Sequence, residues 1–331
     1  MRGALIGVLA LAALAVGMLV LTPPPPAIIV APETVFHVGP LDVTNTMFTS
    51  WVVLVLMAVG ALVAARGFSL VPSGFSGGVE AVVGGFYNMV VGVVGESQGR
   101  RFFWVVSTIF FWVLLNNYVG LLPGNLYVGV PEPGHGETQA VLEQASILGV
   151  DLAYIPLGAD SVDVGAGEEP ITAEKDGDAF SGIIAPVLRS VMTDVNAPLA
   201  IAIFSFIFVE YWGISALGPR YFGKFFNFSR LLRGNPMGLI DVFVGVLELI
   251  SEFIRVVSFT FRLFGNIFAG EVLIVMMSFL VPLLLVTVFY GLELGVGLMQ
   301  AFGFAMLTLV FAQMAVAHHG DGEEGHEAAA H

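Results

Sequence analysis

The amino-acid sequence predicts an all-α polytopic membrane protein with five core transmembrane helices, including a long, steeply tilted C-terminal pair. The first observation behind this prediction is composition: 57% of the 331 residues are apolar and only 11% are charged. The second is a mean hydropathy of +0.90. An ordinary soluble domain has about 25% charged residues. No soluble fold can hide so much apolar surface, so a bundle of helices in lipid is expected.

Five apolar runs are long enough to cross a bilayer, which takes about 20 residues. They are residues 44–65, 102–122, 195–218, 239–280 and 283–317. A helix of about 35 residues extends ~52 Å, more than the ~30 Å hydrocarbon core, so the last two must tilt or bend. Residues 75–98 are also apolar but glycine-rich, and they could lie in the membrane interface rather than span it.

The ends of the chain differ from the membrane domain, which we assign to residues 33–317. Residues 1–32 hold an uncharged run and a proline-rich spacer, and they fit either a signal peptide or an extra transmembrane helix. Residues 318–331 form a polar tail rich in His and Glu. The tail could bind a metal, but a solvated acidic tail is favoured because its glycines offer no rigid geometry.

The basic residues predict the orientation. Seven of the twelve Lys and Arg residues fall within 66–101 and 220–233, which the positive-inside rule assigns to the cytoplasmic side. The connection 131–180 holds eleven acidic residues and one Lys, so it belongs outside, and the C-terminus is then cytoplasmic. This acidic loop, about 124–190 in full, is rich in Gly and Pro and is expected to be poorly ordered.

Several functions are disfavoured by composition and motifs. The net charge of −14 argues against nucleic-acid binding, and the absence of cysteine excludes thiolate metal sites and thiol catalysis. Gly218–Phe225 nearly matches a phosphate loop, but Phe225 replaces the required Ser or Thr. We therefore expect no cofactor, no metal site and no catalytic centre.

One apolar run carries charges that need partners. Glu248, Arg255 and Arg262 are spaced by seven residues and share a helical stripe. Glu252 and Arg255 are three apart and can pair. Arg262 has no acidic residue at three or four positions, and Glu271, nine residues on, lies roughly opposite on the helix. Inserting an arginine at the centre of a transmembrane helix costs about 2.5–3.5 kcal/mol of free energy. Because the guanidinium stays charged, we expect Arg262 to pair with an acidic group of another chain.

Other polar residues lie in the same apolar runs. Glu293 and Gln300 are seven residues apart and share a face of the last helix, while Asn266 follows Arg262 by one turn. Asn117 lies in the run 102–122. Such groups line aqueous paths or form interhelical hydrogen bonds, and both interpretations remain open for the amides.

The ten residues Arg262–Glu271, RLFGNIFAGE, resemble the signature of subunit a of the F-type ATP synthase. Four weaker matches occur in the same order as in that family, over roughly residues 33–317. They are Leu115–Asn117 with Leu121–Pro123, Thr193–Asn196, Glu248, which lies fourteen residues before Arg262, and Gln300–Phe302. The resemblance departs at Gly120, where an Asp is often found, and at Glu271 and Glu293, since many relatives have a His at one of these two positions.

The resemblance implies a proton-conducting stator subunit, not catalytic by itself, in a bacterial plasma membrane. Its partners would be the c-ring subunits, the peripheral-stalk b subunits and the remainder of the ATP synthase. Arg262 would face the ring between two half-channels, beside Gln300. The other residues implied to form the proton path are Glu271, Glu293 and Asn266 in the outer half-channel, Glu248 in the cytoplasmic one, and Asn117 in the neighbouring span.

Two alternatives are weighed against this hypothesis. A stand-alone secondary transporter could use Arg262 to bind an anion, but such proteins often show paired inverted halves, and no such symmetry is visible. A purely structural scaffold leaves the charges within the apolar runs unexplained.

Overall fold

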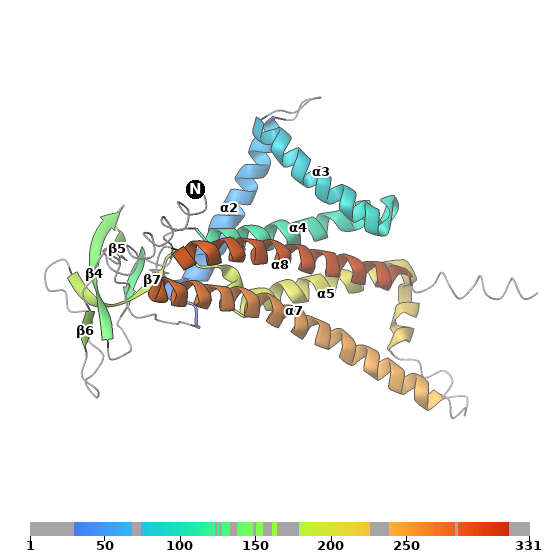
Figure 1. The fold of residues 1–331 in the computed structure, drawn as a ribbon. Coiled ribbons are helices and arrows are strands. Elements are labelled where there is room, and N and C mark those ends of the chain that lie inside the picture. The colour runs from blue at the N-terminus through green and yellow to red at the C-terminus, as the bar shows by residue number, and fades with distance from the viewer. Residues whose placement is uncertain are drawn as a thin grey trace, which may run out of the picture. The chain divides into compact units, whose positions relative to one another are not determined.

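The computed structural model describes residues 30–67, 74–122, 125, 128–132, 138–147, 150–154, 161–163, 179–225, 238–281 and 284–317. Within these residues, six helices are long and apolar enough to cross a membrane (Figure 1). They are α2 (Asn45–Arg66), α3 (Gly74–Val94), α4 (Glu96–Gly120), α5 (Asn196–Leu217), α7 (Gly238–Leu280) and α8 (Leu284–Ala317). The chain is therefore a mostly helical, multi-pass membrane protein, as the sequence predicts.

The helices agree with the predicted spans except around α3 and α4. Helix α4 begins at Glu96, six residues before the predicted run, and its first turn contains an exposed ion pair between Arg100 and Glu96 at 2.7 Å. Helix α3 occupies the glycine-rich run and is a sixth candidate span by length and composition. The predicted leader within 1–29 and the tail 318–331 lie outside the described residues.

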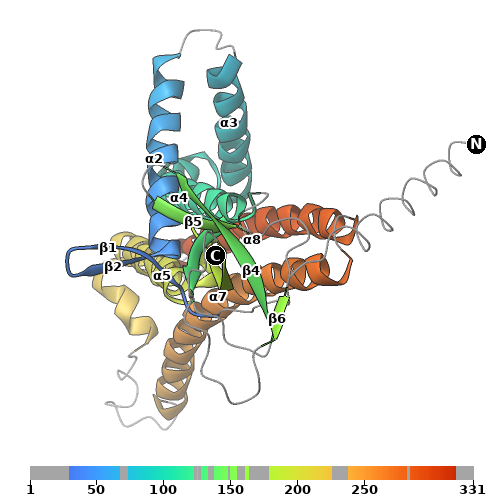
Figure 2. The same cartoon turned by 90° about the vertical axis from the view of Figure 1, so that its left-hand side faces the viewer.

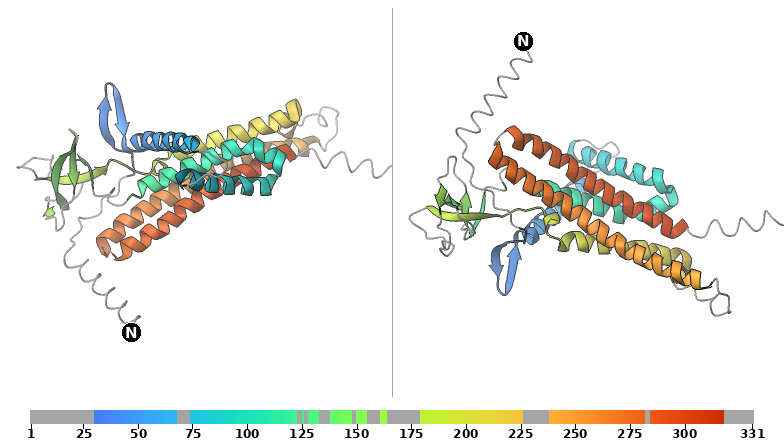
Figure 3. Two further views of the ribbon diagram at one scale, coloured as in Figure 1. Left: turned by 90° about the horizontal axis from the view of Figure 1, so that it is seen from above. Right: turned by 60° about the horizontal axis from the view of Figure 1, so that its bottom comes forward.

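Helices α7 and α8 have the unusual lengths that the sequence predicts. Helix α7 runs for 43 residues without proline, about 64 Å, and α8 for 34 residues, about 51 Å. The two helices pack antiparallel, and Figure 3 shows them side by side. The ring of Phe259 in α7 lies 4.8 Å from that of Phe304 and 5.8 Å from that of Phe311 in α8. Their tilt in the membrane stays a prediction.

The chain forms two compact units, each assembled from separate segments. The second unit comprises Met57–Val113, Val195–Leu263 and Gln300–His331. It is a bundle held by contacts between neighbouring helices. The ring of Phe86 in α3 stacks on Phe110 in α4, and Phe102 in α4 meets Trp212 in α5, both with centroids 4.5 Å apart. The Ser205 hydroxyl in α5 bonds that of Thr308 in α8 at 2.8 Å.

Helix α5 ends at a glycine that lets the chain turn back on the bundle. Gly218 has φ +62°, a left-handed conformation that favours glycine at a helix C-terminus. The short helix η3 (Gly218–Lys224) then returns Tyr221 to α5. A Cβ at Gly213 would lie 2.4 Å from the Tyr221 ring, so the phenol packs directly on the helix backbone there.

The first unit comprises Met1–Leu56, Leu114–Asp194 and Phe264–Met299. It begins with an antiparallel hairpin of β1 (Thr34–Val38) and β2 (Leu41–Thr44), which leads directly into α2 (Figure 2). Gly39, with φ +62°, makes the turn between the strands.

The acidic loop contains a sheet, so the prediction of poor order is wrong for its described strands. Five strands pair antiparallel in the order β5-β3-β7-β4-β6. They are β3 (Val128–Glu132), β4 (Thr138–Ile147), β5 (Val150–Tyr154), β6 (Ser161–Asp163) and β7 (Ala179–Pro186). Leu142 and Ala153 are buried, with Ile184 packed against them. This small apolar core is hidden in the average composition by the glycines, prolines and acids around it.

Candidate functional site

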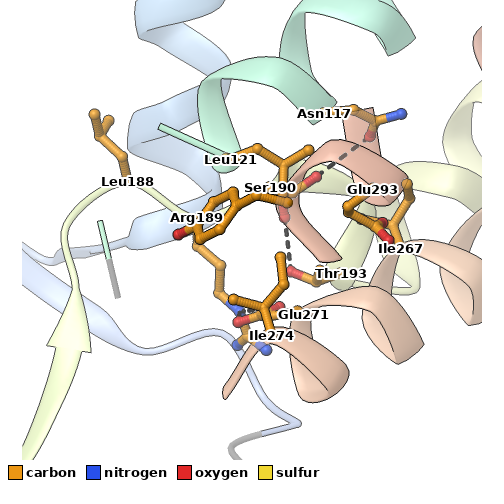
Figure 4. Close-up of a pocket in the computed structure, with 12 residues that line it drawn as sticks. Asn117, Leu121, Leu188, Arg189, Ser190, Thr193, Ile267, Glu271, Ile274 and Glu293 are labelled. Carbon is orange, nitrogen blue, oxygen red and sulfur yellow. Dashed lines mark hydrogen bonds and ion pairs between the residues drawn. The ribbon is translucent and has the colours of Figure 1, made fainter. Parts of the chain in front are cut away.

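The first unit contains a small cavity that brings together three of the predicted site residues, Asn117, Glu271 and Glu293. It lies among the end of α4, residues 188–193, and the first-unit parts of α7 and α8, with a volume of about 20 Å³ (Figure 4). A water needs about 10–15 Å³, so the cavity can hold one. The polar side chains that line it are Asn117, Arg189, Ser190, Thr193, Glu271, Tyr290 and Glu293.

Glu271 is held in this cavity by an arginine that the sequence analysis missed. The Nε of Arg189 donates to both carboxylate oxygens of Glu271, at 2.9 and 3.2 Å. The Arg189 side chain is 4% exposed and that of Glu271 is 19% exposed. The signal for Arg189 was present in the sequence, because it is a lone basic residue in the apolar segment 183–193. A charge in such a segment needs an acidic partner, as was argued for Arg262.

Glu293 lies in the same cavity without such a partner. The residue is only 3% exposed, and its Oε1 accepts no hydrogen bond from the described residues. The carboxyl group lies against Gly270 of α7, where a Cβ would come within 2.0 Å of Oε2. The glycine therefore provides the space that the Glu293 carboxyl occupies between the two helices.

Asn117 connects α4 to both neighbouring walls of the cavity. Its Nδ2 donates to the carbonyl oxygen of Gly297 in α8 at 3.4 Å, and its Oδ1 accepts from the Ser190 hydroxyl at 3.4 Å. The side chain is 1% exposed. The geometry thus fits both interpretations of this amide, since it links helices and also lines the cavity. At Gly120 a Cβ would lie 2.6 Å from the Ser190 backbone, so an Asp would not fit there.

Arg262 has a different environment, in the second unit. Its side chain is exposed, and no carboxylate of the described residues pairs with it. Its guanidinium carbon lies 5.6 Å from the centroid of the Phe259 ring. Gln300 is beside it, as expected, but its Nε2 donates to the Arg262 carbonyl oxygen at 3.2 Å. The glutamine therefore contacts the backbone of Arg262 rather than its guanidinium.

Arg262 belongs to an exposed stripe along α7. Ser258, Asn266 and Ala269 are exposed as well, and with Arg262 they recur at three- and four-residue spacing on one helical face. Asn266 is thus on the stripe and does not line the cavity. An exposed face with a charge at its centre is suited to contact with another chain rather than with lipid alone.

The second unit also holds a charged cluster around α7. The predicted pair of Glu252 and Arg255 is confirmed, and the Arg255 guanidinium lies 3.7 Å from the Phe311 ring centroid. Burial of the Tyr221 phenol raises its pKa, and the neighbouring Glu210 carboxylate raises it further, so the phenol stays protonated. Glu248 is half-buried one turn before Glu252. Tyr221 and Glu210 were not predicted, since they lie outside α7.

No group of three or more potential metal ligands occurs among the residues that the structure describes. The histidines of the tail lie beyond these residues.

Comparison with known proteins shows the family. The family model described as ATP synthase A chain matches residues 47–313. ATP synthase subunit a of Moorella thermoacetica is 24% identical, over 85% of this chain and 95% of its own length. The same subunit of Gloeobacter violaceus is 27% identical, over 89% of this chain and 93% of its own length. That of Trichlorobacter lovleyi is 26% identical, over 85% of this chain and 90% of its own length. Because the match extends from α2 to α8, the chain belongs to the ATP synthase A chain family, that of ATP synthase subunit a.

Proposed function

We propose that this chain is the proton-conducting stator subunit of a bacterial F-type ATP synthase, non-catalytic by itself. It supplies two half-channels to the carboxylates of a rotor c-ring, and it assembles with peripheral-stalk b subunits and the remainder of the enzyme. The observation that carries the proposal is Arg262 on the exposed stripe of α7, where no carboxylate of the described residues pairs with it. Arg255, two turns earlier on the same helix, has its own carboxylate in Glu252.

The chemistry of Arg262 follows from its permanent charge. A guanidinium stays protonated, so a rotor carboxylate that comes opposite it is stabilised in the ionised form. An ionised carboxylate is costly in lipid, so a rotor site leaves the stator only after it binds a proton. The same positive charge repels protons and prevents direct leakage between the half-channels.

The cavity beside Glu271 and Glu293 supports the proposal of an outer half-channel. Glu271, Glu293 and Asn117 line it, and it has room for water, which a proton path requires. Asn266 lies between Glu271 and Arg262 along α7, so we assign it to the transfer towards the rotor. We assign Glu248 to the cytoplasmic half-channel, at the other end of the helix.

A neutral variant of Glu293 tests the outer half-channel. Glu293→Gln should slow ATP-driven proton pumping on the order of 100-fold, the lower end of what a positioned acid or base contributes. Pumping is measured by quenching of a pH-sensitive dye in inverted membrane vesicles, with co-purified c subunit as the measure of assembly. Glu80→Gln on the exposed face of α3 is the matched control. Unchanged proton flux in Glu293→Gln would remove this residue from the path.

We place the acidic loop outside the cell and the C-terminus in the cytoplasm. Helix α3 is assigned to the cytoplasmic interface, because Arg66 precedes it and Arg100 and Arg101 follow it. If α3 crossed the membrane, these basic residues would lie on opposite sides, against the positive-inside rule.

The chain has no native cysteine, so single cysteines can test this orientation. An impermeant maleimide added to intact cells should label Leu41→Cys in the β1–β2 hairpin, whereas Phe222→Cys should react only in inverted vesicles. Both side chains are exposed, at 48% and 51%. Phe75→Cys and Val93→Cys, near the two ends of α3, should both react from the cytoplasmic side. Labelling of these two from opposite sides would show that α3 spans the membrane.

A further inference from the structure

Arg189 is fixed in place by the backbone of its own unit. It lies between β7 and the short helix η2 (Val191–Thr193). Its backbone N–H donates to the Thr49 hydroxyl at 3.0 Å, and its Nη1 donates to the Ala31 carbonyl oxygen at 3.1 Å. Thr49 is itself held, because its hydroxyl donates to the Asn45 carbonyl oxygen at 2.9 Å. The guanidinium is therefore a fixed point of the cavity wall, and Figure 4 shows it directed at Glu271.

The cavity thus contains two carboxyl groups that differ in whether an arginine pairs with them. Glu271 accepts two hydrogen bonds from the Arg189 Nε. Glu293 has no ion-pair partner among the described residues, and its Oε1 is buried without a hydrogen bond. A proton that binds Glu271 must weaken an ion pair, whereas a proton that binds Glu293 breaks no hydrogen bond or ion pair with the described residues.

We propose that Arg189 is a positioning residue of the outer half-channel: it clamps Glu271 as a fixed ion pair, so that Glu293 is the carboxyl group that takes up and releases the proton. The proposal rests on the function proposed above. In the uptake step a hydronium in the cavity transfers its proton to the Glu293 carboxylate, forming an O–H bond and leaving water. In the release step the carboxyl gives the proton up towards the rotor and becomes a carboxylate again.

The clamp also explains why two glutamates can share one small cavity. Two unpaired carboxylates close together would compete for the same proton. The Arg189 charge offsets that of Glu271, and Glu293 is the carboxyl group of the cavity that has no ion-pair partner among the described residues. If the arginine is removed, the uncompensated Glu271 carboxylate becomes a second acceptor for the proton on its way to the rotor.

The test measures proton flux per assembled complex in inverted vesicles of the whole synthase, with c-subunit co-purification as the measure of assembly. Arg189→Gln should lower the flux roughly tenfold, as loss of a partner that orients a functional group usually does. Arg189→Lys keeps the charge and should retain a substantial share of the flux. The double variant Arg189→Gln/Glu271→Gln removes the uncompensated charge, so its flux should exceed that of Arg189→Gln alone.

Each outcome tests whether Arg189 acts by holding Glu271 in an ion pair. Wild-type flux in Arg189→Gln overturns the proposal, and so does a double variant no better than the single one, because Arg189 would then act otherwise than through Glu271. If Arg189→Gln assembles poorly, a purely structural role predicts normal flux in the complexes that form and no gain in the double variant. Glu293→Gln distinguishes failure of the proposed proton path from failure of the proposed role of Arg189. Normal flux there contradicts the proposed path itself, whereas a slow Glu293→Gln with a normal Arg189→Gln contradicts only the clamp.

Discussion

Arg262→Ala should abolish ATP-driven proton pumping while the complex still assembles. Without the guanidinium, a rotor carboxylate that faces α7 finds no positive charge to stabilise its ionised form, so the ring cannot release its proton there. Assembly should survive, because the Arg262 side chain is exposed and pairs with no carboxylate of the described residues. The measurements are dye quenching in inverted vesicles and co-purification of the c subunit.

Two further variants sharpen this prediction. Arg66→Ala removes an exposed arginine at the end of α2 and should pump normally, which controls for loss of a positive charge as such. Arg262→Lys keeps a charge but loses the planar guanidinium, so we expect only partial activity. Pumping by Arg262→Ala at the wild-type rate would contradict the stator mechanism, whatever the other variants do.

The long helices could be predicted because the signal for them is local. Helix α7 has no proline over 43 mostly apolar residues, so its length follows from the sequence. The sheet in the acidic loop could not be predicted in the same way. Its strands gain stability by pairing with segments far away in the chain, as β3 does with β7, and the composition of a segment does not report such partners.

In the site, too, contacts within one helix could be predicted from the sequence, whereas contacts between distant segments could not. The lack of an acidic residue one turn away from Arg262 and the pairing of Glu252 with Arg255 follow from helical spacing, because all three residues lie on one helix. The partner of Glu271 lies 82 residues away in sequence, so spacing gave no means of finding it. Glu271 and Glu293 were assigned to one half-channel by family resemblance alone, and their common cavity supports that assignment.

Gly270→Ala should lower proton flux strongly while it leaves the helices folded. A Cβ at this position would lie 2.0 to 2.3 Å from the carboxyl atoms of Glu293, so the carboxyl group must move out of its place in the cavity. Alanine also favours a helix over glycine by about 1 kcal/mol, so α7 itself should not be weakened. Since a positioned acid or base contributes on the order of 100-fold, we expect most of that factor to be lost. Flux per assembled complex is the quantity to measure.

The cause can be isolated with two comparisons. Gly60→Ala in α2 introduces the same methyl group where no atom lies within 4 Å, and it should conduct normally. If Gly270 acts only by leaving room for Glu293, then Gly270→Ala should have little further effect in a Glu293→Gln background, because the two changes remove the same function. Independent, multiplying effects of the two substitutions would show that Gly270 matters for the approach of α7 to α8 rather than for the carboxyl group it faces.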